Sequence, residues 1–247
     1  MWEALRKSTL VTPAQPAEGG FLTSLAFALA IVTKDVRVEL RSREAASGSL
    51  VFALLTLVIF NFAFDLEGEM KELAGPGVLW VAIVLAGMMG LGYVFAKERA
   101  QGGLEGLLLA PMDRSAIFVG KAAGALLLTF ALEIFLLPLF AIFGNVSILS
   151  PGLIVVVVLG TVGFVTVGTL FSAMAVTTRS RELLLPLLLL PVAIPIVIAA
   201  VEGTRLALQG ETWGELLPAL SVLTAFDALF LTLCPALFEY VIEEMAS

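Results

Sequence analysis

Six long apolar stretches constrain the fold of this chain more than any other feature of its sequence. Each holds 19 to 25 residues, and a helix needs about 20 apolar residues to cross the hydrocarbon core of a bilayer. Of the 247 residues, 60% are hydrophobic and 14% are charged, whereas a soluble domain carries about 25% charged residues. The sequence therefore predicts an all-α integral membrane protein with six transmembrane helices, at residues 45–64, 75–95, 122–143, 152–176, 183–201 and 216–238.

Two of these stretches contain an acidic residue, Glu133 in the third and Asp227 in the sixth. An acid at the centre of a span costs about 2.5 to 3.5 kcal/mol on an insertion scale, but each Leu, Ile, Phe or Val returns about 0.3 to 0.6 kcal/mol, so the apolar neighbours outweigh it. Ionisable residues inside a membrane suggest function, such as proton coupling or binding of a polar part of a cargo. Hydrogen bonding to Thr, Ser or backbone of adjacent helices is the alternative, and we favour it.

The distribution of basic residues predicts the orientation of the chain. If the N-terminus is cytoplasmic, the inner segments contain 12 Lys and Arg residues and the outer loops contain two, Lys71 and Arg205. Short loops rich in Lys and Arg stay on the cytoplasmic side of a membrane. Six crossings return the chain to its starting side, so we expect both termini in the cytoplasm of a multi-pass protein of the bacterial inner membrane.

The N-terminal region contains an apolar run that is too short to be a further span. Residues 1–20 include prolines and glycines and are expected to form a flexible extension, whereas residues 21–32 carry no charge but are too few to cross a bilayer. Apolar residues recur on one helical face from Phe21 to Val36, and four basic residues lie between positions 34 and 43. This pattern predicts an interfacial amphipathic helix at the start of a single six-helix domain, residues 21–247. A cleaved signal peptide is the alternative, but cleavage would leave those basic residues outside.

The segment between the second and third spans has a pattern that the other inner connections lack. Leu104, Leu107 and Leu108 follow the i, i+3, i+4 spacing of one helical face. Pro111 ends this short helix, and Asp113 can cap the next one. A short cytoplasmic helix of this kind fits a groove in a cytosolic partner, although a connector helix resting on the bilayer has the same pattern. The polar candidates around it are Glu98, Arg99, Glu105 and Arg114.

The residue types that are missing exclude several chemistries. The chain has no histidine and one cysteine, Cys234, so by itself it cannot form a closed zinc site, a Cys-ligated iron–sulfur cluster, a Ser-His-Asp triad or a disulfide. It has no phosphate-binding P-loop either, because Gly120-Lys121 is followed by alanine and Ser115 stands where that motif requires glycine. No basic stripe with interleaved aromatic residues suggests nucleic-acid binding. We therefore expect no catalytic residue, no metal site and no cofactor in this chain.

Small residues and prolines within the spans predict how the helices pack and bend. Pairs of small residues four positions apart permit close helix approach, either within the bundle or between two copies of the chain. These pairs are Gly120 with Gly124 and Gly168 with Ser172. Prolines remove a backbone hydrogen bond, so kinks are expected at Pro138, Pro186, Pro191 and Pro195.

The segment from Glu98 to Lys121 resembles the cytoplasmic loop of ABC-2-type transporter permeases, in which a coupling helix contacts the ATPase. More closely, the chain resembles the haem exporter protein B family (CcmB) of cytochrome c maturation. The resemblance covers roughly residues 21–247, with matching segments at 34–44, 58–65, 77–82 and 104–117. At the outer end of the first span, Phe62 and Asp65 stand in a Phe-x-x-Asp pattern similar to that of the family. The same pattern also has an explanation that involves no function: aromatic residues are common at the membrane interface, and a polar residue is expected where a helix meets water.

This resemblance implies the membrane permease subunit of an ABC transporter complex. ATP and Mg would be bound by a separate subunit, CcmA, and two copies of each chain would form an A2B2 complex. The other implied partners are the membrane proteins CcmC and CcmD, the haem chaperone CcmE and the lipid bilayer. Such a complex either exports haem or uses ATP to release the haem-loaded chaperone, and the absence of histidine favours the second account. The alternatives are an ABC-2-type permease for another cargo and a membrane scaffold that transports nothing.

Overall fold

The computed structural model describes residues 21–63, 69–100, 113–146, 148, 150–176, 178 and 181–246. The described residues form α-helices and the connections between them, with no strand in any of these ranges, which confirms the all-α class. The helices are α2 (Phe21–Ser42), α3 (Glu44–Ala63), α4 (Glu69–Val94), α5 (Ala96–Ala100), α7 (Arg114–Gly144), α8 (Pro151–Val176), α9 (Arg181–Leu208) and α10 (Trp213–Ala246).

Six of these helices are long and apolar enough to cross a membrane, which confirms the predicted number of spans. They are α3, α4, α7, α8, α9 and α10. Several of these helices extend beyond the predicted spans. The third span was predicted to begin at residue 122, but α7 begins at Arg114, and α9 and α10 continue to Leu208 and Ala246. The apolar pattern marks only the part of a helix that matches the hydrocarbon core, whereas helical hydrogen bonding continues through the polar residues beyond it.

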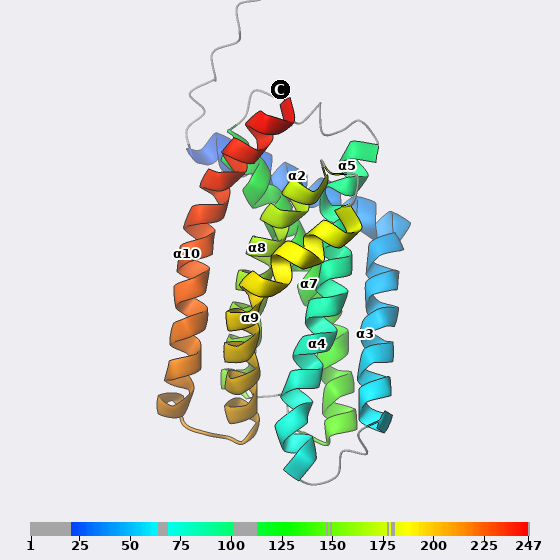
Figure 1. Ribbon diagram of the computed structural model, residues 1–247, viewed down its shortest axis with the longest axis vertical. Coiled ribbons are helices and arrows are strands. Elements are labelled where there is room, and N and C mark those ends of the chain that lie inside the picture. Colours follow the sequence, from blue (N-terminus) through cyan, green and yellow to red (C-terminus); the bar gives the residue numbers. More distant parts are fainter. Residues whose placement is uncertain are drawn as a thin grey trace, which may run out of the picture.

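Helix α2 does not run along the six spans but crosses one end of the bundle, where α5 and the last turns of α10 also lie (Figure 1). We call this the α2 end. The helix packs closely on α7, because a Cβ atom at Gly120 would lie 3.0 Å from the backbone oxygen of Ala28. One turn further along α7, a Cβ at Gly124 would lie 3.6 Å from that of Asp35. This pair of small residues therefore serves helix packing within the chain, and the helix predicted in this region is confirmed.

Helix α8 is the central helix of the bundle and contacts α4, α7, α9 and α10. Its glycines let large side chains approach the backbone: a Cβ at Gly160 would lie 2.3 Å from the Trp80 ring, and one at Gly168 would lie 2.3 Å from Leu91. Ser172 donates a hydrogen bond of 2.6 Å to the backbone oxygen of Leu91. The second pair of small residues, Gly168 and Ser172, thus also packs within the bundle, against α4.

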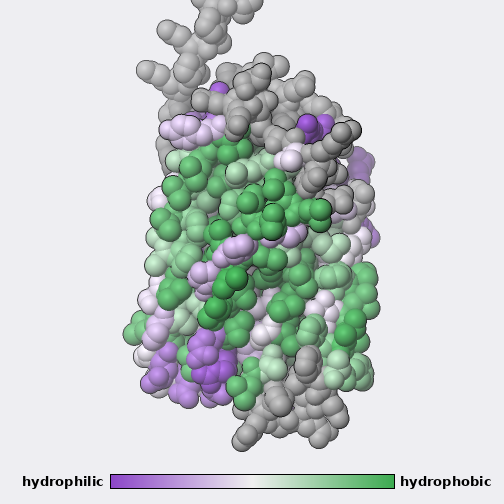
Figure 2. Space-filling model, in the orientation of Figure 1, coloured by the Kyte–Doolittle hydropathy of each residue, from purple (hydrophilic) through white to green (hydrophobic). Residues whose placement is uncertain are grey.

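The outer surface of the bundle is apolar between its two ends. In the face that Figure 2 shows, hydrophobic side chains cover the middle and hydrophilic ones gather toward the ends. Many large apolar side chains are exposed on the outer helices, including Phe62, Ile134 and Ile198. Helix α9, which contains Pro186, Pro191 and Pro195, bends part-way along its length (Figure 1). This distribution fits a bundle that is surrounded by lipid.

Candidate functional site

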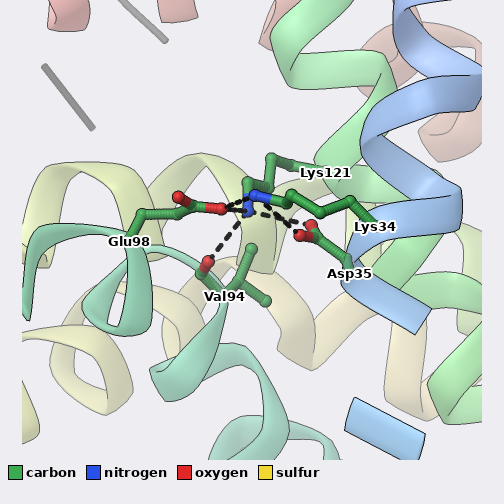
Figure 3. A network of polar contacts seen from close by, with 5 residues as sticks. All are labelled: Lys34, Asp35, Val94, Glu98 and Lys121. Atoms are coloured by element: carbon green, nitrogen blue, oxygen red, sulfur yellow. Dashed lines mark hydrogen bonds and ion pairs between the residues drawn. The ribbon is translucent and has the colours of Figure 1, made fainter. Parts of the chain in front are cut away.

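A buried lysine organises a cluster of charged residues at the α2 end (Figure 3). The Nζ atom of Lys121 on α7 lies 2.8 Å from Oδ2 of Asp35 on α2 and 2.8 Å from Oε1 of Glu98 on α5. It also lies 3.4 Å from the backbone oxygen of Val94 at the end of α4. Lys34 pairs with the same Glu98 oxygen and lies 3.2 Å from Asp35. Two ammonium groups and two carboxylates therefore balance one another where three helices meet, and we call these four residues the Lys121 cluster.

Burial makes the Lys121 cluster sensitive to the loss of its most buried charges, those of Lys121 and Glu98. The side chain of Lys121 is 2% exposed, that of Glu98 is 11% exposed, and Lys34 on the rim is 45% exposed. Removing one partner of a buried ion pair typically costs about 3–5 kcal/mol, because it leaves the other charge uncompensated. A buried ion pair stabilises a fold little more than apolar residues of the same volume would. The large cost of losing one partner therefore comes from the buried charge that is left behind.

Lys34 stays charged throughout the physiological pH range. Burial alone lowers the pKa of its ammonium group, but Glu98 and Asp35 outweigh that effect and raise the pKa above the ordinary value of 10.5. A group whose pKa is raised in the folded protein stabilises it below the ordinary pKa and loses that contribution as the pH rises further. The Lys34 ammonium group therefore keeps its charge at every pH below its ordinary pKa of 10.5.

A second set of contacts joins α5 to the ends of three other helices. Lys97 lies 3.3 Å from Oε2 of Glu39 on α2 and donates a hydrogen bond of 2.8 Å to Ser42. The other carboxylate oxygen of Glu39 accepts a hydrogen bond of 2.8 Å from the backbone N–H of Ala46, in the first turn of α3. Arg99 donates a hydrogen bond to the backbone oxygen of Val176, the last residue of α8. Together with the ion pair of Glu98 and Lys121, these contacts join α5 to α2, α7 and α8.

Helices α5 and α7 contain the described part of the predicted coupling segment. Of its residues, Glu98 and Arg99 lie in α5, and Arg114 is the first residue of α7. The others lie outside the described residues; they are Leu104, Glu105, Leu107, Leu108 and Pro111. Asp113 does occupy the N-cap position of α7, but its side chain makes no capping hydrogen bond, so that part of the prediction was wrong. The ion pair of Glu98 with Lys121 therefore joins α5 and α7, the two helices that precede and follow residues 101–112 in the chain.

Sequence reasoning did not single out most of the residues that make these contacts. Lys121 was assigned to the edge of the third span, and Asp35 and Glu39 were noticed only as part of a matching segment. A usable signal was present, because Asp35 and Glu39 are four residues apart on the helical face that carries Ala28 and Ile31. Acidic residues on the buried face of an amphipathic helix indicate cationic partners in the neighbouring helices.

The two intramembrane acids lie in the interior of the bundle, on either side of α8. Glu133 of α7 is 2% exposed; one of its oxygens accepts a 2.5 Å hydrogen bond from Thr161 of α8, and the other has no partner. Asp227 of α10 is 6% exposed, and neither of its oxygens has a partner. One of them lies 2.6 Å from the place of a Cβ at Gly163 of α8. The predicted hydrogen bond to a neighbouring helix is thus found at Glu133 and not at Asp227.

The acids approach α8 at nearly the same level. Thr161 and Gly163 are two residues apart, so they are separated by about 3 Å along the helix axis and about 200° around it. Both lie close to the middle of α8, which runs from Pro151 to Val176. Glu133 and Asp227 therefore lie on opposite sides of one buried helix, halfway along its length. The described residues contain no group of three or more His, Cys, Asp or Glu side chains that could hold a metal ion.

Of the two outer-face candidates, the structure describes one, at the end of α3 that lies opposite the α2 end. Phe62 is the second-last residue of α3 and is 75% exposed, whereas Asp65 lies outside the described residues. An exposed aromatic residue at the end of a span is typical of the membrane interface. The outer-face site therefore stays a prediction.

The fold and the charged clusters define a multi-pass α-helical membrane protein with its polar contacts concentrated at one end of the bundle. The chain belongs to the CcmB protein family, whose family model matches residues 26–243. This confirms the resemblance found in the sequence.

Three relatives cover most of this chain, and each is named heme exporter protein B. The protein of Pseudomonas aeruginosa is 28% identical over 207 residues, which are 83% of this chain and 91% of the relative. That of Paracoccus denitrificans is also 28% identical over 207 residues, which are 83% of this chain and 94% of the relative. That of Rhodobacter capsulatus is 29% identical over 184 residues, which are 73% of this chain and 84% of the relative.

Proposed function

We propose that this chain is the membrane permease subunit of an ABC-type haem exporter complex in cytochrome c maturation, and that it performs no catalysis itself. The membership of the CcmB family and the names of its relatives support this function. The observation that carries the mechanism is the ion pair of Glu98 with Lys121, which joins the helices on either side of residues 101–112 in the chain. ATP, with Mg, is bound and hydrolysed by a separate subunit of the CcmA type, because this sequence lacks a P-loop.

The coupling works through the α2 end. The ATP-binding subunit contacts segment 101–112, and its movement reaches α5 and α7 first because these two helices flank the segment. From α5, the contact of Arg99 with Val176 carries the movement to the central helix α8. Through Asp35 and Lys121, it also reaches α2. Rigid helices joined by buried ion pairs move as one body, which a chain of exposed contacts would not do.

The α2 end faces the cytoplasm of a bacterium in this proposal. The 12 Lys and Arg residues counted above lie in segments that join the spans at this end or precede α3, against two at the other end. Both chain termini are then cytoplasmic, and the protein resides in the inner membrane. Cytoplasmic placement is also what contact between segment 101–112 and an ATP-binding subunit requires.

The cargo step is the release of a haem-loaded chaperone rather than passage of haem through this chain. The chain has no histidine, and the two buried acids of its interior, Glu133 and Asp227, carry carboxyl groups, which are not among the usual axial ligands of haem iron. In this account two copies of the chain and two ATP-binding subunits form the motor, and CcmC, CcmD and the chaperone CcmE hold the haem. Export of haem by the same complex, and a permease for another cargo, are the competing functions.

Stimulation of ATP hydrolysis tests the proposal. The chain is purified after mild solubilisation and its companions are identified, and the ATPase activity of the ATP-binding subunit is measured with and without it. We expect an ATP-binding protein and haem-handling membrane proteins to co-purify, and we expect hydrolysis to rise several-fold when the chain is present. A membrane scaffold would co-purify without stimulating hydrolysis, and that result would replace the permease with the scaffold. Stimulation by an unrelated cargo, with haem and the haem-loaded chaperone inert, would favour the general exporter.

A further inference from the structure

The charges of α2 are divided between its two sides. Its acids, Asp35 and Glu39, face the bundle and are paired with Lys121 of α7 and Lys97 of α5. No acidic residue is left on the outer side of the described helix, from Phe21 to Ser42, since these two are its only acids. Whatever meets the outer side therefore meets uncompensated positive charge.

Two arginines supply that positive charge. Arg37 and Arg41 are both exposed, and within the part of the chain that the structure describes neither forms an ion pair or a hydrogen bond. They are four residues apart, so they lie about 40° apart around the helix, on the side away from Asp35. Two guanidinium groups one turn apart can hold one phosphate group between them, each with two parallel hydrogen bonds.

Apolar side chains lie beside the arginines on the same exposed surface. Leu25, Leu29 and Leu40 are 45%, 57% and 68% exposed and form a stripe next to the two arginines. A helix with exposed leucines on one side and arginines beside them is suited to the boundary between acyl chains and headgroups. The helix also lies at that level, because it crosses the α2 end, where the six apolar spans finish (Figure 1).

We propose that the outer side of α2 is a binding site for an anionic phospholipid, whose phosphate is held by Arg37 and Arg41 and whose acyl chains lie against Leu29 and Leu40. Because α2 crosses the bundle where the apolar spans finish, the lipid that surrounds the spans is the partner that meets both its leucines and its arginines. A bound lipid would hold α2 in place. Because Asp35 of α2 is paired with Lys121, the lipid would also stabilise the Lys121 cluster, which joins α5 to α7. Lipid composition would thereby influence the coupling.

Lipid binding to the purified full-length chain tests this site. Native mass spectrometry is used to compare phosphatidylglycerol with phosphatidylcholine of the same acyl chains, for the parent chain and for the variants Arg37→Gln, Arg41→Gln and the double variant. We expect the parent chain to prefer phosphatidylglycerol. The preference should fall about fivefold for each substitution and about thirtyfold for both, from the usual contribution of one basic residue near an anionic surface. The double variant with lysine at both positions should keep more than half of the binding free energy, because it keeps the charge.

A matched control comes from the opposite end of the bundle. Arg205 is also a basic residue on a polar surface, but it is paired with Glu202 through two of its nitrogens, so Arg205→Gln should leave the lipid preference unchanged. Equal binding of the two lipids by the parent chain would overturn the proposal, as would an undiminished preference in the double variant. Equal loss in Arg205→Gln would show that only net charge matters and would overturn it too. Loss of the ATP-binding subunit from the double variant, with lipid binding intact, would assign the surface to a protein partner instead.

Discussion

Replacement of Lys121 with methionine should destabilise the protein far more than replacement of any exposed lysine. Methionine keeps the length of the side chain and its contact with the apolar surroundings but removes the ammonium group. The carboxylate oxygens of Asp35 and Glu98 each lie 2.8 Å from that nitrogen, so they are at most 5.6 Å apart, twice that distance. Without Lys121, two anions would face each other at this separation, with only the half-exposed Lys34 to neutralise them.

The expected cost is about 3–5 kcal/mol, which is the usual loss when one partner of a buried ion pair is removed. In a chain of this size each kcal/mol shifts the unfolding temperature by about 2–4 °C, so Lys121→Met should lower it by about 6 to 20 °C. The fluorescence of the tryptophans during heating in detergent measures this shift. Lys34→Met is the matched control, because its half-exposed ammonium group contributes no more than about 1 kcal/mol.

A double variant separates lost charge balance from lost packing. Combining Lys121→Met with Glu98→Gln removes one charge of each sign and leaves Lys34 paired with Asp35 at 3.2 Å. The double variant should therefore be more stable than the sum of the two single effects predicts, by at least about 1 kcal/mol of coupling energy. A Lys121→Met variant as stable as Lys34→Met, or strictly additive effects, would refute the assignment of Lys121 as the neutralising centre of the cluster.

Two further predictions concern helix packing and the intramembrane acids. Gly120→Ala should cost about 1–3 kcal/mol of stability, because its new Cβ would press on the backbone of α2. The control is Gly77→Ala, whose Cβ meets nothing within 4 Å and which should not destabilise the protein. Thermal unfolding compares the two variants, and equal stability would contradict the close approach of α2. Glu133→Gln keeps an oxygen for the Thr161 hydroxyl and Asp227→Asn keeps its shape, so we expect both to retain normal cytochrome c yield. Glu133→Ala should lose about 1–3 kcal/mol of stability by leaving that hydroxyl unpaired, and a loss of yield in a stably folded Glu133→Gln variant would instead show that the acid itself has a function.

The number of spans and the class of fold could be predicted from the sequence because burial in lipid imposes a simple requirement. A span must be apolar over about 20 residues, and that requirement is visible in the chain without knowledge of its neighbours. The helix at Phe21–Ser42 could be predicted for a similar reason, since its periodic apolar residues reflect one buried face. The ends of the helices were less predictable: Arg114 was assigned to the coupling segment and Lys121 to the residue before the third span, yet α7 contains both.

The Lys121 cluster could not be predicted because it depends on how α2 crosses α7. The sequence shows a lysine near an apolar run, and in most membrane proteins such a lysine reaches water at the interface. Here the close approach allowed by Gly120 and Gly124 lays α2 over Lys121 and brings Asp35 to it. The level shared by Glu133 and Asp227 was hidden for the same reason, since it depends on the packing of α7 and α10 around Thr161 and Gly163 of α8.

The most direct test of the account is ATP hydrolysis by the complex after charge is placed on the leucine face of segment 101–112. In the helix predicted there, Leu104 and Leu107 share one face and Leu109 lies on another. The double substitution of Leu104 and Leu107 with glutamate should abolish attachment of the ATP-binding subunit and stimulation of its hydrolysis, with the thermal unfolding of the chain unchanged, while Leu109→Glu should preserve both. Full attachment and full stimulation in the double variant would contradict the claim that the motor acts on this chain through that segment.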